Sequence, residues 1–419
     1  MQQNNELKKD IVAGIIGYLT MVYIVVVNGS ILSEAGLSLE AGMIATILAS
    51  FAGTMLMGFF GKLPLILIPG MGINALFAYS IIGNNGFSFN EGLAVVWMAG
   101  ILFMLTAFTK MGVMLKEAIP ESLKHGITIG LGFFLILIGV EKSGIITAGE
   151  QSVIAMGDFT SPSVIAGIIT LFIAIYLFVK GVPANFLLTM IIGTVIAMLL
   201  GVSTEEAASV HFKFSEMLFM PSFSAASEIS FWVSVFSLAL ILIFENMGIL
   251  SSQLDMLKKT EAYSKSYRIT ATSALLSGIF GTSPTVSGAE NAAVIASGGR
   301  TGKAAITAGI LFLATIFIIP WISMVPATAI SPILIIVGFL MAQNIKYLPW
   351  EQFAECIPAL LIIVMIPFTY SIGDGMAFGF IAYPIVKIAL GKRKEISIPL
   401  LTVSILFFIE FVLKVIGVS

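Results

Sequence analysis

Long, unbroken runs of apolar residues make up most of the chain, and short polar stretches between them hold most of the charges. Runs such as Ile241–Phe244 and Leu360–Ile366 show no alternation of apolar and polar positions. Strands of a membrane barrel alternate with a period of two, whereas a spanning helix satisfies its backbone hydrogen bonds within its own segment. The pattern therefore predicts an all-α protein built from membrane-spanning helices.

The predicted spans form two sets of seven around one polar stretch. The first set comprises residues 12–33, 41–60, 63–82, 92–109, 119–139, 162–179 and 183–201. After the polar residues 202–228, the second set comprises residues 229–250, 267–281, 284–297, 303–321, 325–343, 354–371 and 373–390. A last apolar stretch, 396–416, carries Glu410 and Lys414, and it either crosses the membrane or lies at its interface.

Composition and charge support a membrane protein and predict its orientation. Hydrophobic residues make up 58% of the chain and charged residues 11%, whereas soluble domains carry about 25% charged residues. Cytoplasmic loops hold the excess of Lys and Arg. With a cytoplasmic N-terminus, the predicted inner loops contain Lys62, Lys110, Lys116, Lys180, Lys258, Lys259, Lys265, Arg268, Arg300, Lys303, Lys346, Lys392, Arg393 and Lys394. The predicted outer loops are acidic, apart from Lys142 and Lys213.

The remaining composition excludes several classes of site. A net charge of −2 indicates no nucleic-acid partner. The single cysteine, Cys356, excludes an internal disulfide and a thiolate-rich metal site. The two histidines, His125 and His211, are too far apart in the sequence for a metal cluster. We therefore expect neither a metal nor a cofactor.

An odd number of spans in each half makes the second half enter the membrane from the opposite side. This arrangement is an inverted repeat, which is typical of secondary transporters. The predicted division is a first repeat over residues 1–201, an extracellular linker over 202–228, and a second repeat over 229–419 that includes the C-terminal apolar helix.

The third and tenth spans are interrupted. The third begins Leu63–Gly72, with two prolines and two glycines, and the tenth begins Gly281–Glu290, with Pro284 among small residues. Both favour a short extended piece followed by a half-helix. Non-helical backbone at membrane depth is tolerated where it lines a cavity, and half-helix N-termini facing a substrate mark transport sites. The alternative is a pair of ordinary proline kinks.

Two acidic residues lie inside predicted spans. Glu245 follows the apolar run Ile241–Phe244, and Glu290 lies within the tenth span. An ionised carboxylate in the hydrocarbon costs at least about 2.5 kcal/mol. We therefore expect each residue to face a cavity, or to be protonated part of the time, and so to couple a proton to a substrate. The alternatives are that Glu245 reaches the membrane interface and that Glu290 caps a helix.

Four motifs stand out along the chain: Leu19–Val25 with Asn28, Pro69–Ala75, Gly281–Ser283 with Glu290, and Gly298–Gly302. Together they resemble the nucleobase–cation symporter-2 family, and within it the AzgA-like purine permeases. The resemblance runs in order from about residue 8 to residue 415.

The resemblance implies a fold and a function. The family has fourteen spans, a core domain, here residues 8–115 and 229–322, and a gate domain, here 116–201 and 323–419. Its members import nucleobases with protons, and they are often dimers. It implies a bacterial plasma-membrane protein in contact with lipid. Glu245 and Glu290 match the two acidic positions that face the base. The expected substrate-binding set is Glu245, Glu290, Gly288, Ala289, Asn74, Ala75, Phe77, Asn246 and Asn291, with Glu245 and Glu290 also coupling the proton.

The chain departs from the purine permeases near the expected site. It has Glu245 followed by Asn246 where these permeases usually have Asp and small residues, and it has Asn291 after Glu290. Phe77 and Phe244 are candidates for stacking on a flat ring. These departures leave open another base or another small polar solute, and Na⁺ in place of H⁺. An anion transporter or channel on the same fold is a further alternative, although two carboxylates would repel an anion. A membrane-embedded enzyme would need a nucleophile–base pair or metal ligands, which the sequence does not display.

Overall fold

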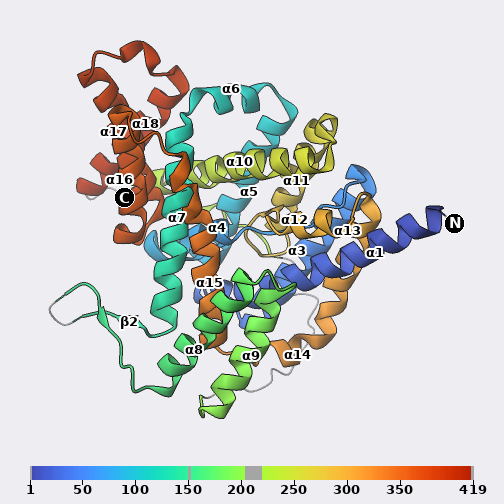
Figure 1. The fold of residues 1–419 in the computed structure, drawn as a ribbon. Coiled ribbons are helices and arrows are strands. Elements are labelled where there is room, and N and C mark those ends of the chain that lie inside the picture. Colours follow the sequence, from blue (N-terminus) through green and yellow to red (C-terminus); the bar gives the residue numbers. More distant parts are fainter. Residues whose placement is uncertain (1, 150–151, 203–218, 417–419) are drawn as a thin grey trace.

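The computed structural model describes residues 2–149, 152–202 and 219–416, and this part of the chain is mostly helical (Figure 1). The elements of the first half are α1 (Gln2–Met21), α2 (Tyr23–Glu34), α3 (Leu39–Leu56), η1 (Met57–Gly61), β1 (Leu67–Pro69), α4 (Met71–Ala75), η2 (Leu76–Asn84), α5 (Phe89–Phe108), α6 (Met111–Ala118), α7 (Glu121–Lys142), β2 (Ile146–Thr147), β3 (Ala155–Met156), α8 (Pro162–Val179) and α9 (Asn185–Leu199). Most of the predicted linker, residues 203–218, lies outside the described residues.

The second half begins with the longest helix in the described part of the chain. Its elements are η4 (Ser224–Ser227), α10 (Ile229–Leu257), η5 (Thr260–Ala262), α11 (Tyr263–Ser277), β4 (Thr285–Ser287), α12 (Asn291–Ala296), α13 (Gly302–Ala314), η6 (Thr315–Ile318), α14 (Ile319–Ile322), α15 (Ala327–Ala342), η7 (Gln343–Tyr347), α16 (Phe353–Thr369), α17 (Ile372–Ala389), η8 (Arg393–Glu395) and α18 (Ile398–Val415).

The helices confirm the predicted membrane architecture. Among the described residues, nine helices are long and apolar enough to cross a membrane, and three shorter apolar helices accompany them. The exact count of fourteen spans stays a prediction. Helix α10 continues to Leu257, beyond the predicted end at residue 250. The sequence understated its length because polar side chains in its last turns, such as Gln253, are buried and hydrogen-bonded.

The two interrupted spans meet at the centre of the structure, which confirms the predicted extended pieces. Strands β1 and β4 pair antiparallel, with Leu67 opposite Ser287 and Pro69 opposite Thr285. Each three-residue strand leads toward a short helix, α4 or α12. Pairing the two extended pieces satisfies backbone groups that hydrocarbon would leave without partners. The antiparallel crossing is the arrangement that an inverted repeat predicts.

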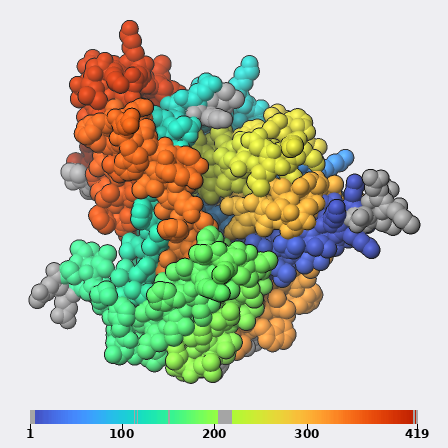
Figure 2. Space-filling model, in the orientation of Figure 1, coloured from blue at the N-terminus to red at the C-terminus, as the bar shows by residue number. Residues whose placement is uncertain are grey.

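The helices form two groups that pack mainly among themselves (Figures 1 and 2). In one, α1, α3, α5, α10, α11 and α13 surround the strand pair. In the other, α7 packs against α15 and α16, α16 packs against α17, and α8 and α9 pack against α15. Glycines allow close approach in the second group, because a Cβ on Gly132 would lie 2.5 Å from the carbonyl oxygen of Gly338. The division into core and gate domains stays a prediction, and these two groups are the physical basis for it.

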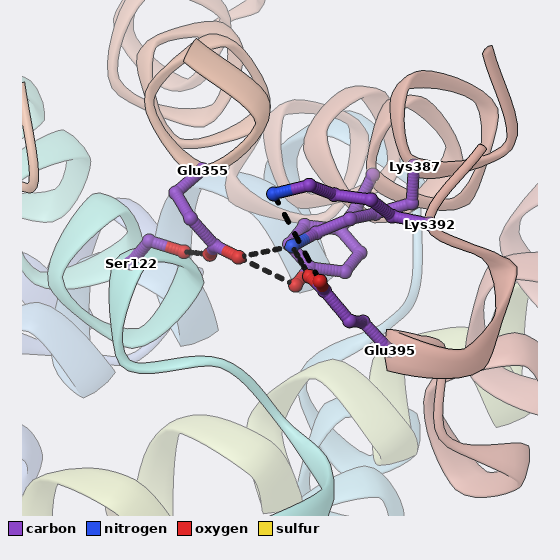
Figure 3. A network of polar contacts seen from close by, with 6 residues as sticks. Ser122, Glu355, Lys387, Lys392 and Glu395 are labelled. Atoms are coloured by element: carbon purple, nitrogen blue, oxygen red, sulfur yellow. Dashed lines mark hydrogen bonds and ion pairs between the residues drawn. The ribbon is translucent and has the colours of Figure 1, made fainter. Parts of the chain in front are cut away.

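A buried ion pair joins several helices of the second group (Figure 3). Lys387 Nζ lies 2.7 Å from Glu355 Oε1 and 2.5 Å from Glu395 Oε2. The hydroxyl of Ser122 and the phenol of Tyr383 donate to the Glu355 carboxylate at 2.5 and 2.8 Å. The network therefore links α7, α16, α17 and η8. Because Glu355 has several donors, its charge is compensated in place.

Candidate functional site

The two predicted carboxylates lie at the crossing of the interrupted spans. Glu245 is inside α10, and Glu290 is in the turn between β4 and α12, where it precedes the first residue of α12. Both residues are half-buried. Helix α10 packs against both β4 and α12, and the backbone N–H of Ser287 donates to Asn246 Oδ1 at 3.4 Å. The fold thus brings the neighbours of Glu245 and Glu290 into contact.

Glu290 is held by a tyrosine from the first span. The phenol of Tyr23 donates to Glu290 Oε1 at 2.5 Å, and Tyr23 is buried with 1% of its surface exposed. Tyr23 begins α2, after a break between α1 and α2 at Val22. The sequence did not single out Tyr23 as a site residue, although a phenol within the apolar run around it was a signal. A hydrogen bond to a buried carboxylate fixes the direction in which its other oxygen points.

Glu245 keeps one acceptor available. Its Oε2 atom is buried and accepts no hydrogen bond from any residue in the described part of the chain. A buried polar atom without a partner costs about 1–3 kcal/mol, so native proteins rarely keep one without a reason. Glu245 therefore keeps an acceptor for which the described residues supply no donor.

Several exposed residues lie next to the two carboxylates. Glu245, Gly248 and Ser252 share one face of α10, and the last two are exposed. A Cβ on Gly248 would have no neighbour within 4 Å. Ala289, next to Glu290, is also exposed, whereas most of α10 before Glu245 is buried. The exposed positions beside the two carboxylates therefore lie toward the Leu257 end of α10, the side that the charge pattern predicts to be cytoplasmic.

Amide side chains hold the crossing together behind the carboxylates. Gln253 Nε2 donates to the Gly288 carbonyl at 2.7 Å, and the Ser287 hydroxyl donates to Gln253 Oε1 at 2.6 Å. Asn246 Nδ2 donates to the Leu242 carbonyl at 2.8 Å. Because Gln253 and Glu245 both lie on α10, the two hydrogen bonds of Gln253 set the position of β4 relative to Glu245. Gln253 was not predicted as a site residue.

Asn291 forms the corresponding hydrogen bonds to the first repeat. Its Oδ1 accepts from the Ile66 N–H at 2.8 Å, and its Nδ2 donates to the Ile66 carbonyl at 3.0 Å. Asn246 and Asn291 are both fully buried. The structure thus places the two asparagines as supports of the crossing, and their predicted contact with a substrate stays a prediction.

The residues predicted in the third span lie deep in the structure. Asn74, Ala75 and Phe77 are buried, and the Ser283 hydroxyl donates to Asn74 Oδ1. Asn74 Nδ2 has no hydrogen-bond partner among the described residues. The ring of Phe77 packs edge-to-face against Phe89, with centroids 5.7 Å apart. A stacking role for Phe77 therefore requires movement of the half-helix that carries it.

Phe244, the other predicted stacking residue, lies at the boundary between the two groups of helices. It is half-buried on α10, and Nζ of Lys124 on α7 lies 5.2 Å from the centre of its ring. Gly72, at the start of α4, also faces the second group, because a Cβ there would lie 3.2 Å from both Leu131 and Met341 side-chain atoms. The region around the two carboxylates is therefore bordered by α7 and α15.

On the side away from the accessible surface, contacts join the two groups. Asn84 Nδ2 donates to the Tyr370 carbonyl at 3.0 Å, and the Ile372 N–H donates to the Ser80 hydroxyl at 2.9 Å. Lys142 on α7 pairs with Glu34 at the end of α2. These contacts join the two groups at the end away from the exposed Gly248 and Ala289.

Comparison with known proteins places the chain in a family. Residues 8–375 match the Permease family. The nucleobase transporter PlAzg2 of Paenibacillus larvae is 41% identical over 90% of this chain and 77% of its own length. The guanine/hypoxanthine permease PbuO of Bacillus subtilis is 36% identical over 98% of both chains. The adenine permease AdeQ of Escherichia coli is 32% identical over 98% of this chain and 94% of its own.

Solved structures share the fold at low sequence identity. The transmembrane domain of the cyanobacterial bicarbonate transporter BicA gives a TM-score of 0.67 at 17% identity, over 88% of this chain and 97% of that domain. The murine Slc26a9 anion transporter in its inward-facing state gives 0.70 at 14% identity, over 91% of this chain and 68% of that one.

Proposed function

The chain belongs to the Permease family of the nucleobase–cation symporter-2 type, and from this premise we propose that it imports a purine base by proton symport. Its relatives are permeases with no enzymatic activity in their names, so the chain is a membrane transporter and not an enzyme. We propose a purine as the substrate because similar permeases are named for guanine, hypoxanthine and adenine. The single observation that carries the proposal is the pair of carboxylates, Glu245 and Glu290, at the crossing of two interrupted spans.

The chemistry of the pair suits a purine. Nucleobases present ring N–H and exocyclic amino donors, and a carboxylate accepts two such donors side by side. Glu245 Oε2 has no partner among the described residues, so it can accept from the base. A site that hydrogen-bonds its substrate rejects a ring without the matching donors, because the buried acceptors are then left unpaired.

The same pair supports proton coupling. Two carboxylates near one substrate repel each other when both are ionised, so a proton on one of them favours binding of the neutral base. Tyr23 holds Oε1 of Glu290, which leaves Oε2 to exchange a proton with the substrate cavity. Binding from outside and release inside would then move a base and a proton together.

Alternating access has a structural counterpart in the two groups of helices. We assign the group around the strand pair to the core and the group of α7–α9 and α15–α17 to the gate. Contacts such as Asn84 with Tyr370 join the groups on the predicted outer side, while Gly248 and Ala289 are accessible from the predicted inner side. We assign this arrangement to the inward-facing state, with the N-terminus in the cytoplasm of a bacterial cell. Dimerisation through the gate stays a prediction.

Anion transport is the second candidate, because the solved structures of the same fold include a bicarbonate and an anion transporter. The electrostatics of this chain oppose it. The side chain that donates to Glu290 is the neutral phenol of Tyr23. Two carboxylates at the site would therefore repel an anion.

Uptake into liposomes tests the proposal. The purified protein is reconstituted, and uptake of labelled adenine, guanine, hypoxanthine, xanthine and uracil is measured with and without an inward proton gradient. The proposal expects uptake of at least one purine that collapses with a protonophore. Uptake of bicarbonate or chloride, with no uptake of any base, would replace it with the anion alternative.

A further inference from the structure

Asp10, near the start of the first span, is a buried carboxylate outside the candidate site. It lies on α1 and is 3% exposed. Its Oδ1 accepts from the backbone N–H groups of Arg300 and Thr301 at 2.8 and 3.1 Å, and its Oδ2 accepts from the Thr301 hydroxyl. Successive backbone N–H groups that point at one spot make an anion-binding concavity. Asp10 is the anion that occupies this one, in the loop Gly298–Thr301 between α12 and α13.

This loop and α12 form one compact unit. Nη1 of Arg300 donates to the carbonyls of Ile295 and Gly299 at 2.6 and 2.8 Å. Carbonyls in the last turn of a helix have no partner inside it, and here the guanidinium supplies one. Arg300 also donates its backbone N–H to Asp10, so one residue bonds both α12 and α1. Glu290 precedes the first residue of α12, at the opposite end of a helix of six residues. A displacement of the loop is therefore passed to Glu290 through this short helix.

The first span holds the unit at both ends. Helix α1 packs against α12 and α13 (Figure 1), and a Cβ on Gly17 would lie 2.5 Å from Val294 Cγ2. The backbone of α1 thus comes close to α12. Tyr23 bonds to Glu290 at the start of α12, and Asp10 bonds to the loop after its end. The half-helix that follows Glu290 therefore lies along the first span, with a polar contact at each end.

The helix that carries Glu245 is tied to the same loop. Lys259, just after the end of α10, donates from Nζ to the Arg300 carbonyl at 2.8 Å. This contact is exposed, and exposed charged contacts contribute less than buried ones. The buried Asp10 carboxylate, with three donors, is therefore the main support of the place where α1, α10 and α12 meet.

We propose that Asp10 is a positioning residue for the pair of carboxylates. It fixes the loop, and through Arg300 and α12 it sets the place of Glu290 relative to Glu245. Without Asp10, two N–H groups and a hydroxyl lose their acceptor, and Tyr23 alone holds the turn of Glu290 from the first span. The effect on transport rests on the proposed function, whereas the effect on the position of Glu290 does not.

Uptake kinetics of the transported purine in liposomes give the first test. Asp10→Ala removes all three hydrogen bonds, and we expect KM to rise about tenfold or more because bonds to a charged group are the stronger ones. Asp10→Asn should lie between Asp10→Ala and the wild type, since its Oδ1 still accepts from both N–H groups but without the charge. Glu6→Gln is the control, because Glu6 is an exposed carboxylate one turn earlier on α1, and it should keep the wild-type KM. A folded Asp10→Ala protein with wild-type KM overturns the proposal.

A double-mutant cycle with Tyr23→Phe shows whether Asp10 acts through Glu290. Changes that affect the same group are not additive, whereas independent changes are. We expect the KM of the double variant Tyr23→Phe/Asp10→Ala to differ from the product of the two single changes. The corresponding cycle of Tyr23→Phe with Glu6→Gln should give the product. A product relationship for Asp10 as well would make it a residue of stability alone.

A second measurement needs no transport, so it separates this proposal from the proposed function. Ala289→Cys in a Cys356→Ala background places a thiol at an exposed position beside Glu290. We expect Asp10→Ala to change the rate of maleimide labelling of this thiol severalfold, and Glu6→Gln to leave it unchanged. If the wild type carries no base while the labelling rate changes, the proposed function fails and the positioning role stands. An unchanged labelling rate in folded Asp10→Ala protein overturns the role. If Asp10→Ala is not recovered folded, Asp10→Asn decides by the same measurements.

Discussion

The phenol of Tyr23 donates a 2.5 Å hydrogen bond to Glu290 Oε1, although the two residues are 267 positions apart. One belongs to the first repeat and the other to the second, so the bond joins the two halves at the site. Because the acceptor is a carboxylate, the bond belongs to the stronger class of protein hydrogen bonds. The position of Glu290 therefore depends on the first span as well as on its own turn.

Replacing Tyr23 with Phe removes this bond and leaves the ring in place. A hydrogen bond to a charged group is worth about 1.5–3 kcal/mol, so we expect uptake of the transported base to fall roughly 10- to 100-fold in kcat/KM. The measurement is initial uptake into liposomes over a range of base concentrations. Tyr18→Phe is the control, because Tyr18 contacts Thr315 at 2.8 Å and not Glu290. A Tyr23→Phe protein with wild-type kinetics would remove Tyr23 from the site.

Gln253 is expected to position the turn that carries Glu290. Gln253→Leu removes the donor to the Gly288 carbonyl and the acceptor of the Ser287 hydroxyl proton, at a cost of about 1–3 kcal/mol. We expect KM for the base to rise about tenfold or more, since the geometry of the two carboxylates changes, while folded protein is still recovered from the membrane. Gln343→Leu, an exposed position on η7, serves as the control. An unchanged KM with a lower yield of folded protein would make Gln253 a residue of stability alone.

Gly248 reports on access to the site. Since no atom lies within 4 Å of a Cβ at this position, Gly248→Cys in a Cys356→Ala background should fold normally. We expect a membrane-impermeant maleimide to label it from the cytoplasmic face and much more slowly from outside. A transported base should slow the labelling. Ala239→Cys, buried on the same helix, should stay unlabelled. Faster labelling from outside would reverse the assigned orientation.

The closed side can be locked. Asn84 and Tyr370 are joined by a 3.0 Å hydrogen bond between the two groups of helices, so cysteines at both positions should form a disulfide on oxidation. We expect oxidation to stop uptake and reduction to restore it, because the outer side can no longer open. Each single cysteine variant is the control and should be insensitive to the oxidant. Continued uptake by the cross-linked protein would exclude opening between these residues.

The sequence predicted those features that depend on local chemistry. Proline and glycine in Leu63–Gly72 and around Pro284 predicted the interrupted spans, which the β1–β4 pair confirms. An acid inside an apolar run singled out Glu245 and Glu290, because a charge is costly there whatever surrounds it. Both signals can be read without knowledge of any distant contact.

Features that depend on contacts between distant segments were not predictable. Tyr23 and Gln253 became candidate site residues only when the fold placed Glu290 and Gly288 beside them. Asn246 and Asn291, which were predicted to contact the substrate, bond to backbone groups of α10 and of the third span, respectively, and their contact with a substrate stays a prediction. An amide has the same donors and acceptors in both roles, so the sequence cannot distinguish a binding residue from a support.

The most direct test of the central claim compares the wild type with Glu290→Gln in the same liposomes, under an inward proton gradient, for the purine that the wild type transports. Glutamine keeps the size of the side chain and can still form hydrogen bonds through its amide, but it carries no exchangeable carboxyl proton. The account predicts that uptake driven by the gradient is lost in the variant, while the folded protein is recovered in normal amount. Gradient-driven uptake at the wild-type rate by Glu290→Gln would contradict it, and proton coupling would then have to be assigned elsewhere in the protein.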